Sequence, residues 1–291
     1  AAMTAPAGRI AFVLHAHLPF VLNHGVWPHG ADWLSEAAAE TYVPLLAAMR
    51  ALERDGVPFR LNLALSPVLC EQLASSRFGE EFAPYLDRKI AAARENEAEF
   101  GGRGEHALAA LAHEWIGYYQ GVRHEWAVAC VGNLLNGFRH FATTGALEIM
   151  TCGATHGYFP LLGRDVMAIR AHERHFGVRP RGIWLPECAY RPAGPWSPPV
   201  GARWASQERK GIEELLAEHG LSFFVVDTDM VRGRVAHDLY AARFPRLQEP
   251  RGGASPSLHV PYDVGSGVAA LARDPDTGLQ VWSGEHGYPG D

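Results

Sequence analysis

The sequence has few cysteines, no excess of basic residues and no long apolar run. Its four cysteines, Cys70, Cys130, Cys152 and Cys188, form no CxxC pair and show no regular spacing. They predict buried, reduced thiols in a reducing compartment. The net charge of -6 and the pI of about 6.2 argue against nucleic acid or an anionic membrane as partner. No apolar run reaches the roughly 18 residues of a membrane span, so we expect a cytoplasmic protein.

Three common catalytic motifs are also missing. The chain has no GxSxG nucleophile elbow, no phosphate-binding loop and no dinucleotide fingerprint. We expect no cofactor. With 291 residues, 47% of them hydrophobic, the chain can bury a large core and has a normal length for an α/β barrel.

The sequence does contain an alternation of short apolar runs with longer helical patterns. Runs rich in β-branched and aromatic residues predict strands at Arg9–Leu14, Phe59–Leu65, Ala146–Thr151, Gly182–Leu185 and Ser222–Val226. Helical spacing predicts helices at Glu36–Asp55, Phe82–Phe100, within Leu108–Thr143 (two helices), at Gly163–Phe176 and at Gln207–His219. Strands separated by helices predict βαβ units and a parallel sheet. Five such units favour a barrel over an open sheet.

Two segments interrupt this alternation. Pro192–Arg203 is rich in proline and glycine, and such a composition excludes a helix or a central strand. With the elements after it, this segment could begin an inserted subdomain. Phe244–Val260 is a second stretch rich in loop residues.

Polar side chains follow each predicted strand at the point where the strand ends. In chain order they are His15 and His17, Ser66, then Cys152, Thr155 and His156, then Glu187, and last Asp227 and Asp229. In α/β barrels the active site is built from the C-terminal ends of the strands. Five strand ends carrying such residues therefore predict one polar pocket, in which Glu187 is surrounded by hydrogen-bond donors.

Each of these residues also has a plain structural explanation. A histidine after a strand is often only hydrogen-bonded, Glu187 could interact with a helix dipole, and Asp227 or Asp229 could be an N-cap. The cysteines fit inert packing. The coincidence at consecutive strand ends favours the functional pocket.

Three functions compete for this pocket. A metal-dependent barrel hydrolase would bind its ion through the HxH pair His15 and His17, with His156 and Asp227 as further ligands. A glycosidase or transglycosylase would use paired carboxylates, and tryptophans such as Trp27, Trp184, Trp196 and Trp282 suit sugar faces. A sugar-binding barrel without catalysis is the third.

Several motifs favour the second function. HAHLPF (His15–Phe20), ALEIMTCGATHGYFPLL (Ala146–Leu162) and GIWLPECAY (Gly182–Tyr190) resemble the first three motifs of glycoside hydrolase family 57. VWSGEHGYPGD (Val281–Asp291) is similar to a segment before the later motifs of that family. The resemblance covers essentially the whole chain and is strongest to the 1,4-α-glucan branching enzymes.

The resemblance implies an incomplete (β/α)7 TIM-like barrel with a small inserted subdomain. The expected barrel comprises residues 1–190 and 246–291, and the expected insertion after the nucleophile strand comprises residues 191–245. The family's remaining strands, its helical C-terminal domain and its acid/base aspartate lie downstream of GYPGD. We therefore expect the chain, which stops at Asp291, to be the N-terminal part of a longer enzyme.

The resemblance also implies roles for particular residues. Glu187 is expected to be the nucleophile of a retaining reaction. The expected substrate-binding residues are His15, His17, His156, Trp27, Arg273, Trp282 and Gly290. The expected partners are an α-1,4-glucan, such as amylose or glycogen, and the C-terminal half of the same enzyme; no metal is expected. An α-amylase, a 4-α-glucanotransferase and an inactive glucan-binding fragment remain alternatives.

Overall fold

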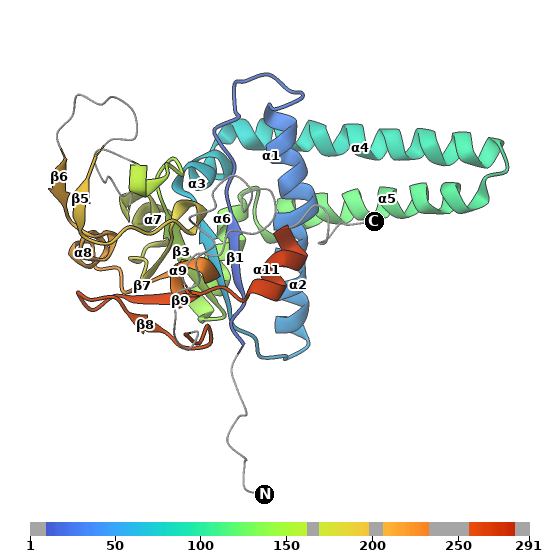
Figure 1. Cartoon of the computed structure of the whole chain (residues 1–291). Helices are drawn as coiled ribbons and strands as arrows, with labels where there is room; N and C mark the ends of the chain where they lie inside the picture. Colours follow the sequence, from blue (N-terminus) through green and yellow to red (C-terminus); the bar gives the residue numbers. More distant parts are fainter. Residues whose placement is uncertain (1–9, 162–168, 198–205, 233–255, 283–291) are drawn as a thin grey trace, which may run out of the picture. The chain divides into compact units, whose positions relative to one another are not determined.

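The computed structural model describes residues 10–161, 169–197, 206–232 and 256–282 (Figure 1). The chain divides into two compact units. Unit 1 comprises Ala1–Ile149 and Arg170–Val178, and unit 2 comprises Met150–Ile169 and Arg179–Asp291.

The strands of unit 1 are parallel. β1 (Val13–Ala16) pairs with β2 (Leu61–Leu65), with Leu14 opposite Leu63. The next strand in the order is β3 (Leu147–Cys152), which begins in unit 1. Leu63, Ala64 and Leu65 are all buried, as expected for a parallel strand that is covered on both faces.

The first helices of unit 1 follow one another with little interruption. They are α1 (Ala31–Ala37), a π-helical segment (Ala38–Tyr42) and α2 (Val43–Arg54). Helical structure thus begins at Ala31, about five residues before the predicted helix Glu36–Asp55. α3 (Pro67–Ala74) was not predicted. It begins with proline at its first position, where the missing N–H costs no helical hydrogen bond.

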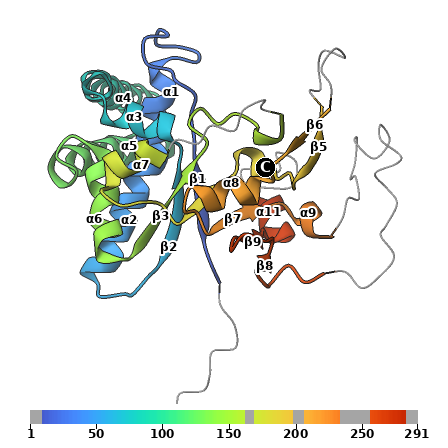
Figure 2. The ribbon, with the colours of Figure 1, turned by 90° about the vertical axis from the view of Figure 1, so that its left-hand side faces the viewer.

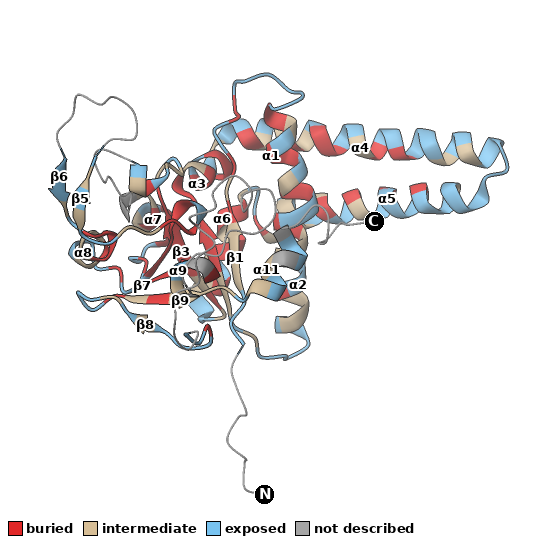
Figure 3. Cartoon of the chain, viewed as in Figure 1, coloured by how far each residue is buried: buried red, intermediate tan, exposed pale blue. Residues whose placement is uncertain are grey.

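Two long antiparallel helices, α4 (Ser76–Gly102) and α5 (His106–His124), extend side by side (Figure 1). α4 starts six residues before the predicted helix because the Ser75 hydroxyl accepts a hydrogen bond from the Arg77 amide and caps the helix. Its last buried residue is Ala93, and the helix beyond that point is mostly exposed (Figure 3).

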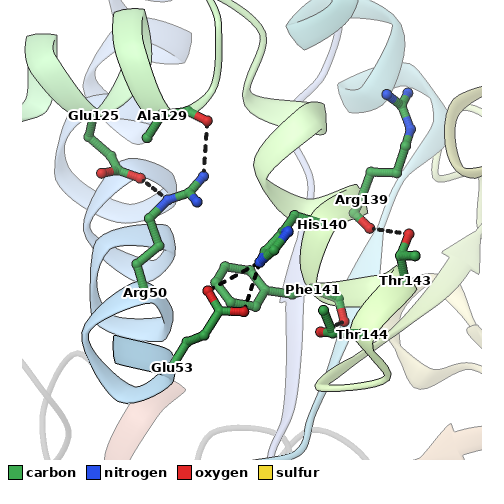
Figure 4. Close-up of polar contacts among 9 residues, drawn as sticks. All are labelled: Arg50, Glu53, Glu125, Ala129, Arg139, His140, Phe141, Thr143 and Thr144. Carbon is green, nitrogen blue, oxygen red and sulfur yellow. Dashed lines mark hydrogen bonds and ion pairs between the residues drawn. The ribbon is translucent and has the colours of Figure 1, made fainter. Parts of the chain in front are cut away.

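The rest of unit 1 consists of α6 (Leu134–Thr144) and α7 (Ile169–Phe176). α6 begins at the N-cap Asn133 and ends at Gly145, which adopts the left-handed conformation that favours glycine. Polar contacts connect α2 to its neighbours (Figure 4). Arg50 Nε lies 2.5 Å from Glu125 Oε1, and Glu53 Oε1 lies 2.8 Å from His140 Nε2.

Unit 2 contains a mainly parallel group of strands. The end of β3 pairs with β4 (Gly182–Trp184), β4 pairs with β7 (Phe223–Val226), and β7 pairs with β9 (Ala269–Ala272). β8 (Tyr262–Asp263) adds an antiparallel strand to β9. The core packed against these strands includes Ile183, Leu185, Phe224, Val226, Ile212 and Leu216.

The remaining elements of unit 2 are short. They are the 3₁₀ turns η3 (Phe159–Leu161) and η4 (Pro186–Cys188), and the helices α8 (Ile212–Glu218), α9 (Thr228–Arg232) and α11 (Pro275–Trp282). β5 (Gly194–Trp196) pairs only with the antiparallel β6 (Gln207–Arg209) in a separate two-stranded sheet (Figure 2).

The predicted helix at Gln207–His219 was wrong at its start. Residues Gln207–Arg209 form β6, and the helix begins only at Ile212, after Gly211. The Gly211 N–H donates to the Glu214 side chain, so the glycine acts as the N-cap. The exclusion of a helix or central strand after Pro192 agrees with the structure for the described residues, because β5 lies in a two-stranded sheet.

The α/β class with a mainly parallel sheet is confirmed. Every predicted strand overlaps an observed one, whereas β8, β9 and α11 were not predicted. None of the helices in the described part of the chain is both long and apolar enough to cross a membrane.

Candidate functional site

Glu187 lies directly after β4, on the 3₁₀ turn Pro186–Cys188. Its backbone has φ 57° and ψ 26°, in the left-handed region, and Cys188 also has a positive φ of 52°. Such a conformation is unfavourable for residues with a side chain and persists where the surrounding structure requires it. The turn leaves the Glu187 side chain 62% exposed, while Pro186 and Cys188 are buried.

His156 provides the contact to this carboxylate. Its Nε2 atom lies 3.4 Å from Glu187 Oε1, and its side chain is only 11% exposed. His156 also has a positive φ, 59°, and its amide donates to the carbonyl of Gly153 in a tight turn after β3. Parallel neighbouring strands end at the same edge of a sheet, so the residues after β3 and β4 meet.

The charge state of His156 follows from its burial. Burial lowers the pKa of His156 below its ordinary value of 6.5, although the Glu187 carboxylate opposes this shift. At neutral pH the imidazole is therefore uncharged, with one N–H. Since a carboxylate only accepts hydrogen bonds, the 3.4 Å contact places this N–H on Nε2. His156 thus gives Glu187 a hydrogen bond without adding a positive charge.

A charged pair lies near the same turn. Arg273, which follows β9, forms an ion pair with Asp227, which follows β7. Asp227 also accepts a hydrogen bond of 2.7 Å from the Thr228 amide at the start of α9. Burial raises the pKa of the Cys188 thiol to about 12, an effect that nearby Arg273 opposes and that nearby Asp227 and Glu187 reinforce. Arg273 and Asp227 therefore act in opposite directions on the pKa of Cys188, the residue next to Glu187.

Unit 1 holds the predicted histidine pair. His15 lies on β1 opposite Ala64, and His17 follows the end of the strand. The His17 Nδ1 atom lies 2.9 Å from Ser66 Oγ, and Ser66 is fully buried. Ser66 follows β2 in the same way that His17 follows β1, so the parallel register brings the two side chains together.

The loop after His17 carries the predicted aromatic residue Trp27, which is 78% exposed. The base of the loop is fixed by the buried Gln72 of α3. Its side-chain oxygen accepts from the Val21 amide at 2.7 Å, and its nitrogen donates to the Pro19 carbonyl at 3.0 Å. The tryptophan is therefore presented to solvent on a loop whose start is anchored in the core.

The structure brings some of the predicted site residues into contact, whereas others lie outside its described part. Within unit 2 it brings His156 to Glu187 and places Arg273 on Asp227; within unit 1 it brings His17 to Ser66. Trp282 ends α11 and Asp229 lies in α9, but their side chains lie outside the described part of the chain. Gly290 lies outside the described residues altogether.

Cys152 was placed at a strand end in the sequence analysis but was given no role beyond packing, yet it contacts His156. Its Sγ atom lies 3.1 Å from His156 Nδ1. The spacing Cys152-Gly-Ala-Thr-His156 is the signal in the sequence, because a turn after a strand can bring such residues together.

Known proteins resemble this chain along nearly its whole length. The family model described as Glycosyl hydrolase family 57 matches residues 11–290. A 1,4-alpha-glucan branching enzyme of Thermococcus kodakarensis is 40% identical over 292 residues, which is 98% of this chain and 41% of that protein.

Solved structures also resemble this chain along nearly its whole length. The GH57-type branching enzyme of Pyrococcus horikoshii has a TM-score of 0.83 at 39% identity and covers 98% of this chain and 50% of that chain. The alpha-amylase AmyC of Thermotoga maritima has a TM-score of 0.74 at 29% identity, over 98% of this chain and 49% of that chain. The chain thus spans about half the length of these relatives.

Proposed function

The chain belongs to glycosyl hydrolase family 57, and from this premise we propose that it is the nucleophile-bearing part of a 1,4-α-glucan branching enzyme. Relatives and solved structures with that activity in their names support the proposal. The observation that carries it is the exposed Glu187 carboxylate, held on a strained turn and hydrogen-bonded by the uncharged His156. An α-glucan, such as amylose or glycogen, is the proposed substrate.

The proposed reaction proceeds with retention of configuration. A Glu187 oxygen attacks the anomeric carbon of an α-1,4-linked glucose, the bond to the 4-oxygen breaks, and a general acid protonates that oxygen. The 6-hydroxyl of another glucan then attacks the covalent glycosyl-enzyme and gives its proton to the same group. An α-1,6 branch forms and Glu187 is released as a carboxylate.

The proton donor is proposed to lie beyond Asp291. Within the described part of unit 2, one Asp227 oxygen is ion-paired with Arg273 and the other accepts a hydrogen bond from the Thr228 amide, so this carboxylate is engaged within the protein. The relatives extend well beyond the matched region, which leaves room for the donor in the C-terminal half of the enzyme.

We propose an incomplete (β/α)7 barrel as the architecture around Glu187, with residues 1–190 and 246–291 as barrel and 191–245 as insertion. The separate β5–β6 sheet supports an insertion in this segment. The segment also contains β7, which pairs with β4 and β9. The insertion proper is therefore proposed to be the part around the hairpin.

The remaining substrate-binding roles are proposals as well. His15, His17, Trp27, Arg273, Trp282 and Gly290 are assigned to glucan binding. Trp27 is the best supported for stacking on a sugar, because its ring is exposed on an anchored loop. The likeness to an alpha-amylase favours hydrolysis as the alternative fate of the intermediate, with water replacing the glucan acceptor.

The test is branch formation from amylose by the longer enzyme that contains this chain, counted as chains released by a debranching enzyme. Glu187→Gln should lower the rate at least about a thousandfold, as removal of a nucleophile does. Glu208→Gln, on the exposed strand β6, is the matched control and should stay active. If Glu187→Gln kept most of its activity, the assignment would be wrong. Stoichiometric zinc would instead favour the metal-dependent hydrolase.

A further inference from the structure

We propose that Cys152 is a positioning residue: its S–H donates to His156 Nδ1 and so fixes the imidazole tautomer that presents Nε2–H to Glu187. The inference deepens the proposed function and rests on it for its catalytic consequence. The hydrogen-bond chain itself stands on the geometry of unit 2.

The three side chains form a continuous series of contacts. Cys152 is the last residue of β3 and is completely buried. Its Sγ atom lies 3.1 Å from His156 Nδ1, and His156 Nε2 lies 3.4 Å from Glu187 Oε1. The turn closed by the His156 amide and the Gly153 carbonyl, 3.1 Å apart, brings the two ends of this short segment together.

The protonation states decide the direction of each hydrogen bond. Burial raises the pKa of Cys152 to about 12, and the neighbouring Cys188 and Glu187 add to this shift. Cys152 is therefore a thiol at neutral pH and can donate. Burial lowers the pKa of His156, so the ring has one N–H and one lone pair.

Only one tautomer satisfies the contacts with both Cys152 and Glu187. With the proton on Nε2, the ring donates to the carboxylate and its Nδ1 lone pair accepts from the thiol. With the proton on Nδ1, a lone pair would face the Glu187 oxygen, and two acceptors would repel each other. In an uncharged histidine the hydrogen bond at one nitrogen sets the proton on the other, so the Cys152 thiol at Nδ1 and the Glu187 carboxylate at Nε2 favour the same tautomer.

The direct test is nuclear magnetic resonance of the chain with ¹⁵N-labelled histidine. Nitrogen shifts distinguish a protonated from an unprotonated ring nitrogen, and loss of one signal set in His156→Gln assigns the residue. We expect Nε2–H alone in the unmodified protein. Cys152→Ala leaves only the 3.4 Å contact with the largely exposed Glu187 to favour this tautomer, so a second, Nδ1–H population should appear beside the first. Cys152→Ser, which retains a donor, should restore the single form. Cys188→Ala is the matched control, a second buried thiol of unit 2, and should leave the tautomer unchanged.

Kinetics of the branching reaction provide a second readout. Cys152→Ala should lower kcat about five- to tenfold, the size of one hydrogen bond, and change KM little. Since the thiol bonds to the neutral ring, its loss should raise the pKa of His156. The ring nitrogen shifts, followed through a pH titration, should show this rise in Cys152→Ala, and Cys152→Ser should return the pKa.

The outcomes separate this inference from the proposed function. A single Nε2–H tautomer with an unchanged His156 pKa in Cys152→Ala would overturn the inference. If Cys152→Ala does not fold, an Nδ1–H tautomer in the unmodified protein or in Cys152→Ser would overturn it equally. A chain with the expected tautomers but without branching activity in its longer enzyme would support the hydrogen-bond chain and contradict the function.

Discussion

Gly153 is the position at which one methyl group should disturb the site without touching a reacting residue. A Cβ atom added there would lie 2.8 Å from Phe159 Cε1 and 3.1 Å from Pro186 Cγ. Ordinary contact begins near 3.4 Å, so the neighbours must move by about 0.6 Å, the difference between 3.4 Å and 2.8 Å. The Phe159 ring is buried in the core of unit 2, and Pro186 directly precedes Glu187.

We expect Gly153→Ala to lower both stability and activity. Overpacking of this size costs about 1–3 kcal/mol of unfolding free energy. A displacement of about 1 Å at a catalytic group can cost about a hundredfold in rate, so a shift of this size should lower kcat about tenfold or more. Urea unfolding measures the first effect, and the initial rate of branch formation, at a temperature where the variant is folded, measures the second.

Gly182→Ala is the control for stability alone. Its added Cβ would lie 2.2 Å from the Phe223 ring, at the start of β4 and away from the turn that holds Glu187. It should destabilise the protein at least as much as Gly153→Ala, with a smaller loss of kcat. The reasoning would be refuted if Gly153→Ala kept full kcat, or if both variants lost kcat in proportion to their lost stability.

Two further predictions concern stability. Burial lowers the pKa of His172 to about 4 from 6.5. Between these pH values the unfolded chain binds more protons at this residue than the folded chain does. The free energy of unfolding should therefore fall by up to about 3 kcal/mol as pH drops from 6.5 to 4. His172→Gln should remove this dependence in urea titrations, and an equally steep dependence in the variant would contradict the assignment. Glu125→Ala should lower the free energy of unfolding by about 2 kcal/mol, because it leaves the partly buried Arg50 without its carboxylate (Figure 4). Glu53→Ala, at the pair with His140 that is 44% exposed on both sides, should lower it by less than about 1 kcal/mol. Equal losses in urea unfolding would contradict the argument that burial decides the contribution of each pair.

The strands of the fold could be predicted wherever they are rich in β-branched or aromatic residues. Phe223–Val226 has the sequence FFVV and was predicted within one residue. Ala269–Ala272 has the sequence AALA, which gives no strand signal, because its pairing with β7 decides its structure. α3 was missed for a similar reason, since eight residues after a strand show too little helical periodicity.

The centre of the site could be predicted because it follows from topology. Residues after neighbouring parallel strands lie at one edge of the sheet, so His156 and Glu187 were expected near each other, and they are in contact. The contact of Cys152 with His156 depends on a turn in which His156 has a positive φ. A histidine at that position does not by itself predict such a turn. The pairing of Asp227 with Arg273 connects residues 46 positions apart through β7 and β9, and β9 was not recognised.

The most direct test of the account is the mass of a trapped glycosyl-enzyme. A fluorinated α-glucosyl fluoride carries a leaving group that needs little protonation, so the covalent intermediate can form without the proposed proton donor, and the ring fluorine slows its breakdown. The account predicts one added glycosyl group, located by peptide mapping on Glu187 and absent in Glu187→Gln. An adduct on another residue, or none in a protein that branches amylose, would contradict it.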